Sequence, residues 1–324
     1  MNSVHRAFNS VCKSIEKNAW FGVLLAAVMV LLLVSVRNKL NQATVRPYSG
    51  SFIESFVQSS SSSRMSADLI VKQDADTKDA FYASVYDDLF NQKVNNAYEV
   101  GELVNAYPDI TTQAIALDVG AGTGAFMNAF IQNGITNVTG IESSSDMVAQ
   151  AKRSYPGMNI VKGNPAAASA FKPDSFTLVS VLNFEVYHIP NTEQLFSNVY
   201  AWLKPGGYFV LHLVDPRRFN AASMLGGESA NPARNKAHSA AKFNDFEYTS
   251  DVQVFPNDMV QYMEVFTDEK TGKVRKNVRN FKLPPPHEFI ALATGAGFNM
   301  LGQIDLVKAG KEYQYFYLFY KPAN

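Results

Sequence analysis

A glycine-rich segment at residues 117–124, with the sequence LDVGAGTG, constrains the fold more than any other part of the chain. It leaves an apolar strand and enters a helix, and glycines at 120, 122 and 124 remove side chains where a ligand must lie against the backbone. The first turn of the following helix adds N–H groups that have no partner inside the helix. The segment therefore predicts a ligand-binding site at the end of a strand.

Helical and strand patterns alternate from about residue 77, which is typical of a parallel sheet with crossover helices. Periodicity predicts helices over residues 80–106, 125–133, 144–154 and 193–203. Apolar runs predict strands over residues 114–119, 138–141, 159–161, 176–182 and 208–214. We therefore expect an α/β domain over residues 77–324.

The alternation stops after residue 214. Residues 215–250 are polar, and we expect a solvated loop or a lid there. Residues 259–267 and 273–281 read as two strands of a hairpin whose loop ends in Gly272. Prolines 284–286 precede an expected helix over 287–294, capped by Gly295 or Gly297, and the last two strands, 300–307 and 314–320, are expected to pair antiparallel.

A carboxylate follows the second strand of the domain. Glu142 stands eighteen residues after Gly124, where it can accept hydrogen bonds from both hydroxyls of a ribose. Each such bond to a charged acceptor contributes about 1.5–3 kcal/mol. Gly120, Gly122 and Ala125 also fit the loop of dinucleotide enzymes, so a nicotinamide-dependent oxidoreductase is one alternative at this point.

Two further elements accompany the loop, namely Asn164 after the third strand and the sequence LKPGG at residues 203–207 before the fifth. Together these elements resemble the class I S-adenosylmethionine-dependent methyltransferases (type 11-like) over about residues 80–320. The resemblance implies a Rossmann-like sheet, mostly parallel with an antiparallel last strand, with a small inserted β-hairpin region over residues 215–285 on the acceptor side. It also implies S-adenosyl-L-methionine as cofactor, with the glycine loop at its methionyl part, Glu142 at the ribose and Asn164 at the adenine.

The family commonly has aspartate where this chain has Asn164. The expected cofactor-binding residues are Asp118, Gly120, Ala121, Gly122, Gly124, Glu142, Ser143, Met147, Asn164, Asn183 and Tyr86.

Candidate catalytic residues follow the fourth strand, where related enzymes line the methyl group. His188 is a candidate general base, needed only when the acceptor carries a proton, and its alternative is a histidine held by packing. Glu185 and Tyr187 are its neighbours and the other candidates. Tyr86 is a candidate to face the sulfonium through a cation–π contact, or else a core residue.

The N-terminal region has a different character. Residues 19–36 contain no charge, and as a helix they would extend about 27 Å, close to the hydrocarbon thickness of a bilayer. We expect a single transmembrane helix there, a juxtamembrane segment over residues 1–18 and a flexible Ser-rich linker over residues 37–76. A cleaved signal peptide is the alternative. Basic residues flank the span equally, so the expectation that the catalytic domain faces the cytosol rests on the cofactor, and an organelle membrane stays open.

Composition narrows the expected partners. Lysine plus arginine equals aspartate plus glutamate at 29 each, so we expect no nucleic-acid partner. One cysteine excludes a multi-cysteine metal site, and no metal is expected. A local basic excess after residue 215 favours an anionic acceptor or lipid headgroups. The expected function is methyl transfer to a small-molecule or amphiphilic acceptor near a membrane. The alternatives are a non-catalytic, membrane-held interaction module and the oxidoreductase, and the oligomeric state stays open.

Overall fold

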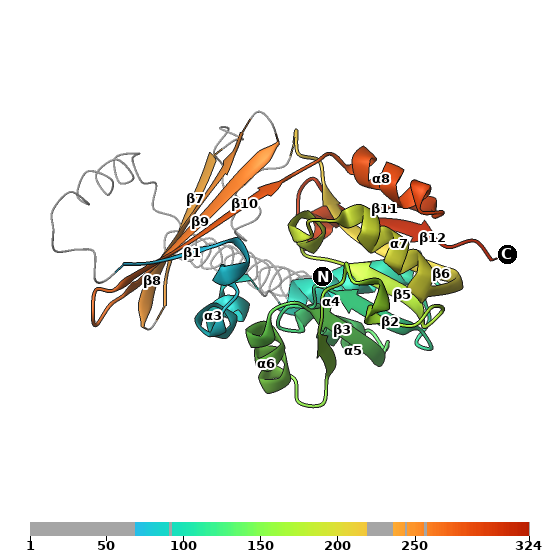
Figure 1. Ribbon diagram of the computed structural model, residues 1–324, viewed down its shortest axis with the longest axis horizontal. Coiled ribbons are helices and arrows are strands. Elements are labelled where there is room, and N and C mark those ends of the chain that lie inside the picture. The colour runs from blue at the N-terminus through green and yellow to red at the C-terminus, as the bar shows by residue number, and fades with distance from the viewer. Residues whose placement is uncertain (1–68, 91–92, 219–235, 244, 256–257, 324) are drawn as a thin grey trace, which may run out of the picture. The chain divides into compact units, whose positions relative to one another are not determined.

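The computed structural model describes residues 69–90, 93–218, 236–243, 245–255 and 258–323 (Figure 1). A seven-stranded sheet has the order β11-β12-β6-β5-β2-β3-β4. Its strands are β2 (Ile115–Val119), β3 (Asn137–Glu142), β4 (Asn159–Lys162), β5 (Phe176–Val181), β6 (Leu203–Val214), β11 (Asn299–Asp305) and β12 (Gln314–Tyr320). β2 to β6 pair in parallel, whereas β12 pairs antiparallel with β6 and β11.

Parallel pairing brings the carboxyl ends of the central strands to one edge of the sheet, which is where open α/β sheets bind ligands. The edge carries the glycine loop after β2, Glu142 at the end of β3 and Asn183 after β5. Residues distant in sequence therefore become neighbours.

Helices cover both faces of this sheet, so its strands are apolar on both sides. One buried cluster joins the sheet to α4 (Lys93–Ala106), α5 (Ala125–Gln132) and α6 (Ser145–Ser154). A second cluster joins the other face to α7 (Thr192–Trp202) and α8 (Pro286–Gly295). Leu117 and Val119 belong to the second cluster and Ala116 to the first, as the alternation of a strand requires.

A second, five-stranded sheet has the order β1-β10-β9-β8-β7. Its strands are β1 (Leu69–Gln73), β7 (Lys236–Lys242), β8 (Phe246–Val254), β9 (Met259–Asp268) and β10 (Val274–Lys282). The hairpin expected over residues 259–281 is confirmed, because β9 and β10 pair antiparallel with Thr267 opposite Val274. The inserted region is larger than the expected hairpin, however.

Two segments expected to lack regular structure are strands of this second sheet. β7 and the first half of β8 lie within the expected loop, and β8 buries only every second residue, including Tyr248, Ser250 and Val252. This segment forms a strand because β9 and β7 pair with it on either side. β1 lies within the expected linker, and it pairs in parallel with β10.

Several boundaries also differ from expectation. The single helix expected over residues 80–106 is described as α3 (Ala80–Phe90) and α4, and residues 91–92 lie outside the described part. β6 begins at Leu203 and so includes the expected LKPGG turn. β11 ends at Asp305, where the 3₁₀ helix η5 (Leu306–Ala309) begins. The last capping position of α8 is Ala296, and Gly297 follows with φ of 107°.

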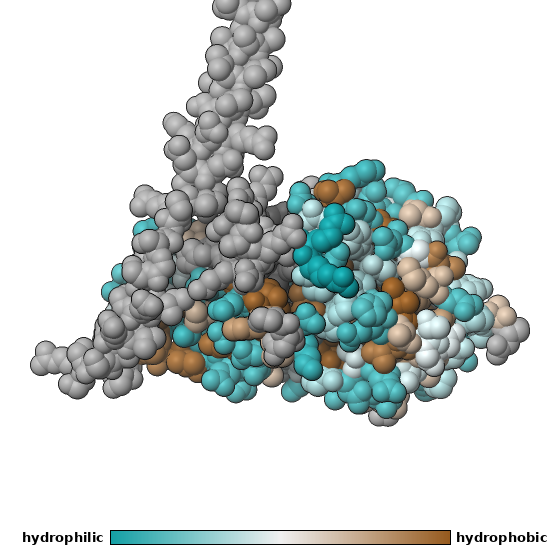
Figure 2. All heavy atoms as spheres, turned by 90° about the horizontal axis from the view of Figure 1, so that it is seen from above, coloured by the Kyte–Doolittle hydropathy of each residue, from teal (hydrophilic) through white to brown (hydrophobic). Residues whose placement is uncertain are grey.

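No helix among the described residues is both long enough and apolar enough to cross a bilayer. The expected juxtamembrane segment, the expected span over residues 19–36 and most of the expected linker lie outside the described residues, so they stay predictions. On the face seen in Figure 2, hydrophilic surface separates the apolar residues into small patches.

Candidate cofactor and acceptor site

The glycine loop adopts a backbone conformation that side chains resist. Gly120, Gly122 and Gly124 have φ of 72°, 54° and 85°, in the left-handed region. The amides of Gly120 and Ala121 both donate to the carbonyl of Ile141, at 2.9 and 3.1 Å. The loop is thereby tied to β3 before α5 begins.

Glu142 lies beside this loop and is fully buried. Its carboxylate accepts hydrogen bonds from the amide of Gly122 at 3.0 Å, the amide of Ser144 at 2.8 Å and the hydroxyl of Ser143 at 3.2 Å. The sequence-based pairing of loop and carboxylate is therefore present in the structure, with the carboxylate held in position by backbone donors.

The three glycines differ in what surrounds them. A Cβ built on Gly122 would meet only the carbonyl oxygen of Gly120, at 4.0 Å, so the backbone there is bare. A Cβ built on Gly120 would lie 2.0 Å from Cγ of Glu185. Glu185, which starts the 3₁₀ helix η3 (Glu185–His188), therefore lies directly on the glycine loop.

Lys78 completes this part of the site, and the sequence interpretation missed it. Its Nζ lies 3.2 Å from Oε2 of Glu185, and its carbonyl accepts the hydroxyl of Ser144 at 2.6 Å. Burial lowers the pKa of Lys78, but the carboxylates of Glu185 and Glu142 outweigh this and raise the pKa above its ordinary value. No local pattern marks Lys78, because its partner is 107 positions away.

Helix α3 reaches the same edge of the sheet through Tyr86. The amide nitrogen of the Asn183 side chain donates to the Tyr86 hydroxyl at 3.2 Å, and Asn183 and Phe184 have φ of 49° and 64°. Such φ values cost non-glycine residues energy and are maintained by surrounding structure. Burial raises the pKa of Tyr86 to about 12, so its hydroxyl keeps its proton at neutral pH. Thr123 also donates to Asp87 of α3.

The other expected cofactor residues are placed as follows. Asp118 is buried below the loop, accepts the Ser180 hydroxyl at 2.8 Å, and has a pKa raised by burial to about 7. Met147 is buried against α3. Asn164 is exposed, and its side-chain oxygen accepts the amide of Ala166 at 2.9 Å, which shapes the turn after β4.

The three candidate catalytic residues have different surroundings. Glu185 lies on the glycine loop, as described above. The ring of His188 is 4.6 Å from that of Phe281 on β10, and burial with the charges of Arg279 and Lys78 lowers its pKa well below the ordinary value. The same burial and neighbouring charges that keep His188 neutral also make it a weak proton acceptor. The buried Tyr187 hydroxyl accepts the amide of Val214 at 3.0 Å, which favours a structural part for Tyr187.

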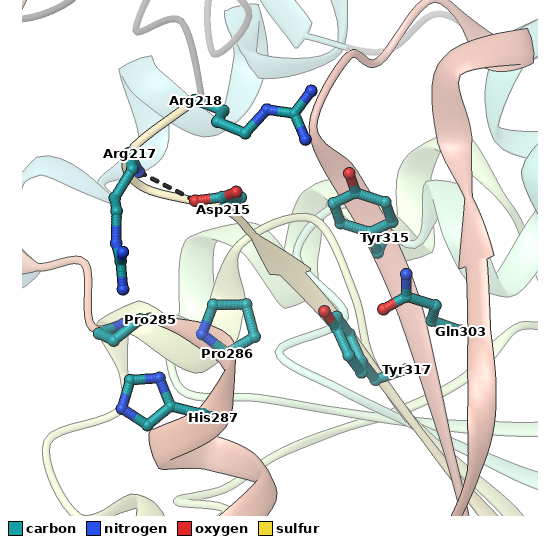
Figure 3. A pocket seen from close by; sticks show the side chains of 9 residues that line it. All are labelled: Asp215, Arg217, Arg218, Pro285, Pro286, His287, Gln303, Tyr315 and Tyr317. Carbon is teal, nitrogen blue, oxygen red and sulfur yellow. Dashed lines mark hydrogen bonds between the residues drawn. The ribbon is translucent and has the colours of Figure 1, made fainter.

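A pocket of about 490 Å³ lies farther along the same edge, where the region over residues 215–285 begins and ends (Figure 3). Arg217 extends toward His287, and Arg218 extends toward Tyr315. The amide of Arg217 donates to the carboxylate of Asp215 at 3.1 Å. The pocket thus combines two guanidinium groups with polar and aromatic groups, the remaining lining residues being Pro285, Pro286, Gln303 and Tyr317.

Residues 116–207, which include the glycine loop, Glu142 and β5, match a family model described as a methyltransferase domain. Over these residues the chain is similar to methyltransferase domains. The match confirms the predicted enzyme class, a methyltransferase, and it covers the part of the sheet that forms the glycine-loop site. No match was found among curated proteins.

Several solved structures share the fold of this chain. An S-adenosylmethionine-dependent methyltransferase from Clostridium acetobutylicum is 15% identical, with a TM-score of 0.56 over 75% of this chain and 98% of its own. DesVI from Streptomyces venezuelae is 20% identical, with a TM-score of 0.56 over the same shares. CalS10, an amino pentose methyltransferase from Micromonospora echinaspora solved with S-adenosylmethionine, is 18% identical, with a TM-score of 0.54 over 74% and 96%. The predicted fold class of the methyltransferase domain is confirmed.

Proposed function

We propose that the chain transfers a methyl group from S-adenosylmethionine to a small-molecule acceptor. The observation that carries the proposal is bare backbone at Gly122 next to the fully buried carboxylate of Glu142. A ligand can approach that backbone closely, and the carboxylate can accept bonds from ribose hydroxyls. CalS10, which shares the fold, was solved with S-adenosylmethionine bound, in agreement with this choice of cofactor.

The charges of the site fit a cationic cofactor. Glu142 and Glu185 place two carboxylates at the loop, and Lys78 places one ammonium beside Glu185, where its pKa also responds to Glu142. S-adenosylmethionine, when bound, supplies a sulfonium methyl group with a good leaving group. Since such a transfer depends mainly on alignment, the chain contributes by holding the two reactants together, which is worth about 7–11 kcal/mol in well-oriented reactions. His188 stays the candidate general base where the acceptor carries a proton, although its lowered pKa makes it a weak one.

The acceptor side of the proposal rests on the pocket at Arg217 and Arg218. Guanidinium groups bind carboxylates and phosphates with two parallel hydrogen bonds, so the acceptor carries an anionic group. Saturable binding of inorganic pyrophosphate to the full chain, weakened about tenfold by Arg218→Gln and unaffected by Arg153→Gln on α6, is the expected result. Equal weakening by both substitutions would contradict an anion site in this pocket.

The proposal includes the membrane. Residues 19–36 anchor the chain, the linker lets the domain reach the bilayer surface, and the domain faces the cytosol, where the cofactor is made. An amphiphilic acceptor suits an enzyme held near a membrane.

Calorimetric titration of the full chain in detergent with S-adenosylhomocysteine tests the cofactor. We expect binding that Glu142→Ala weakens at least tenfold and that Glu193→Ala, an exposed carboxylate on α7, leaves unchanged. Absence of binding at millimolar ligand would contradict the proposal. Binding of NAD in its place would support the oxidoreductase. Cofactor binding without methyl transfer to any acceptor would support the interaction module.

A further inference from the structure

The ion pair between Lys78 and Glu185 occupies an unusual place. Nζ of Lys78 lies 3.2 Å from Oε2 and 3.4 Å from Oε1 of Glu185. The side chains of Lys78 and Glu185 are only 19% and 17% exposed. Glu185 covers Gly120 so closely that a Cβ on this glycine would overlap its Cγ. The pair thus lies on the loop whose neighbouring backbone, at Gly122, is bare.

Burying these two charges gains the fold little. Taking an ion pair out of water costs several kcal/mol, and the attraction between the partners often does no more than restore that cost. Packing alone would be served as well by two apolar side chains. A pair retained at the edge that binds ligands is better explained by charges that a ligand needs.

The α-amino acid end of a methyl donor carries one carboxylate and one ammonium on the same carbon. Its carboxylate can replace Glu185 as the partner of Lys78, and its ammonium can replace Lys78 as the partner of Glu185. After this exchange every buried charge keeps an opposite partner, which avoids the penalty of about 3–5 kcal/mol for leaving one charge unpaired.

We propose that Lys78 and Glu185 recognise the amino acid end of the methyl donor, and that their mutual ion pair covers Gly120 when this end is absent. The inference rests on the proposed function and deepens it. It makes Glu185 a cofactor-recognition residue rather than a general base, because its carboxylate is engaged by the ammonium of Lys78 and, after the exchange, by the ammonium of the donor.

The test compares two ligands that share the nucleoside and the thioether sulfur. S-adenosylhomocysteine has the amino acid end, whereas 5′-methylthioadenosine has a methyl group instead. In calorimetric titrations of the full chain, we expect Lys78→Gln and Glu185→Gln to lower the affinity for S-adenosylhomocysteine at least tenfold. The affinity of both variants for 5′-methylthioadenosine should stay within threefold of the wild-type value.

Two controls separate recognition from folding. Lys72→Gln removes another lysine that forms an ion pair, with its Nζ 3.8 Å from Asp79. This substitution should change the affinity for neither ligand. Lys78→Arg keeps the positive charge and should retain most of the affinity for S-adenosylhomocysteine. The inference would be overturned if Lys78→Gln lowered the affinity for both ligands equally, or if it left the affinity for S-adenosylhomocysteine unchanged. If neither ligand binds the wild type, the proposed function itself fails.

Discussion

Gly120 is the residue at which backbone conformation and close packing act together. Its positive φ disfavours any side chain, and Glu185 fills the space that a Cβ needs. Gly272 in the β9–β10 loop has a similar φ of 69° but no atom within 4 Å of a built Cβ. The two glycines therefore separate backbone strain from steric overlap.

We predict that Gly272→Ala costs about 1–2 kcal/mol of unfolding free energy, from strain alone. Gly120→Ala should cost about 1–3 kcal/mol more, because it also overpacks against Glu185. Urea denaturation measures both. Within a Glu185→Ala background, which carries its own cost for leaving Lys78 unpaired, Gly120→Ala should cost no more than Gly272→Ala, and a persisting additional cost would show that Glu185 is not the obstacle.

Asp118 gives a prediction for pH. Burial raises its folded pKa to about 7 from an ordinary value of 3.8. The folded state therefore holds a proton that the unfolded chain has lost, so this contribution to stability is complete below pH 4 and disappears as pH rises to about 7. Asp118→Asn should reduce the pH dependence of the unfolding free energy in this window, measured by denaturation at pH 5 and pH 8. An unchanged dependence would contradict the protonated state.

At the scale of elements, a buried polar cluster joins α3 to the second sheet. The carboxylate of Glu264 on β9 is fully buried and accepts hydrogen bonds from Tyr82 of α3 and Tyr248 of β8, each at 3.0 Å. Arg279 of β10 lies 3.1 Å from the same carboxylate and also donates to the Tyr82 hydroxyl at 2.8 Å. Because α3 also carries Tyr86, this cluster fixes the position of Tyr86, one wall of the proposed cofactor site, from the second sheet.

Glu264→Ala should therefore destabilise the chain by about 3–5 kcal/mol, since it leaves Arg279 buried without a carboxylate partner. Glu247→Ala on β8 removes an exposed carboxylate 4.0 Å from Lys242 and should cost less than about 0.5 kcal/mol. Denaturant midpoints of the two variants give the comparison. Similar midpoints would show that the cluster contributes no special stability.

At the scale of the whole molecule, we predict that residues 19–36 anchor the chain in a membrane and so decide where the α/β domain works. Each arginine at the centre of a span opposes insertion by about 2.5–3.5 kcal/mol. Ala27→Arg with Val28→Arg should therefore release the chain from membranes that resist alkaline carbonate. Ser60→Arg with Ser61→Arg, in the serine run of the linker, should leave it bound. Release of the wild type by carbonate would contradict a transmembrane helix.

The sequence by itself was enough for the parallel sheet and for the pairing of the glycine loop with Glu142. Apolar strands, glycine turns and a carboxylate at a strand end are local patterns, and parallel strands bring their carboxyl ends together wherever they form. The expected hairpin and the final antiparallel strands were also right for this reason. The enzyme class and the cofactor came from the family resemblance that these elements carry, and the family model that matches residues 116–207 agrees with the enzyme class.

Only the tertiary structure placed Lys78 opposite Glu185 and made strands of residues 69–73, 236–242 and 246–254. These features depend on partners far away along the chain, and no local spacing records them. It also separated the three catalytic candidates, because Tyr187 packs against β6 while Glu185 lies on the loop. A side chain's neighbours decide its burial and its charge state, and these neighbours are brought together only by the folded chain.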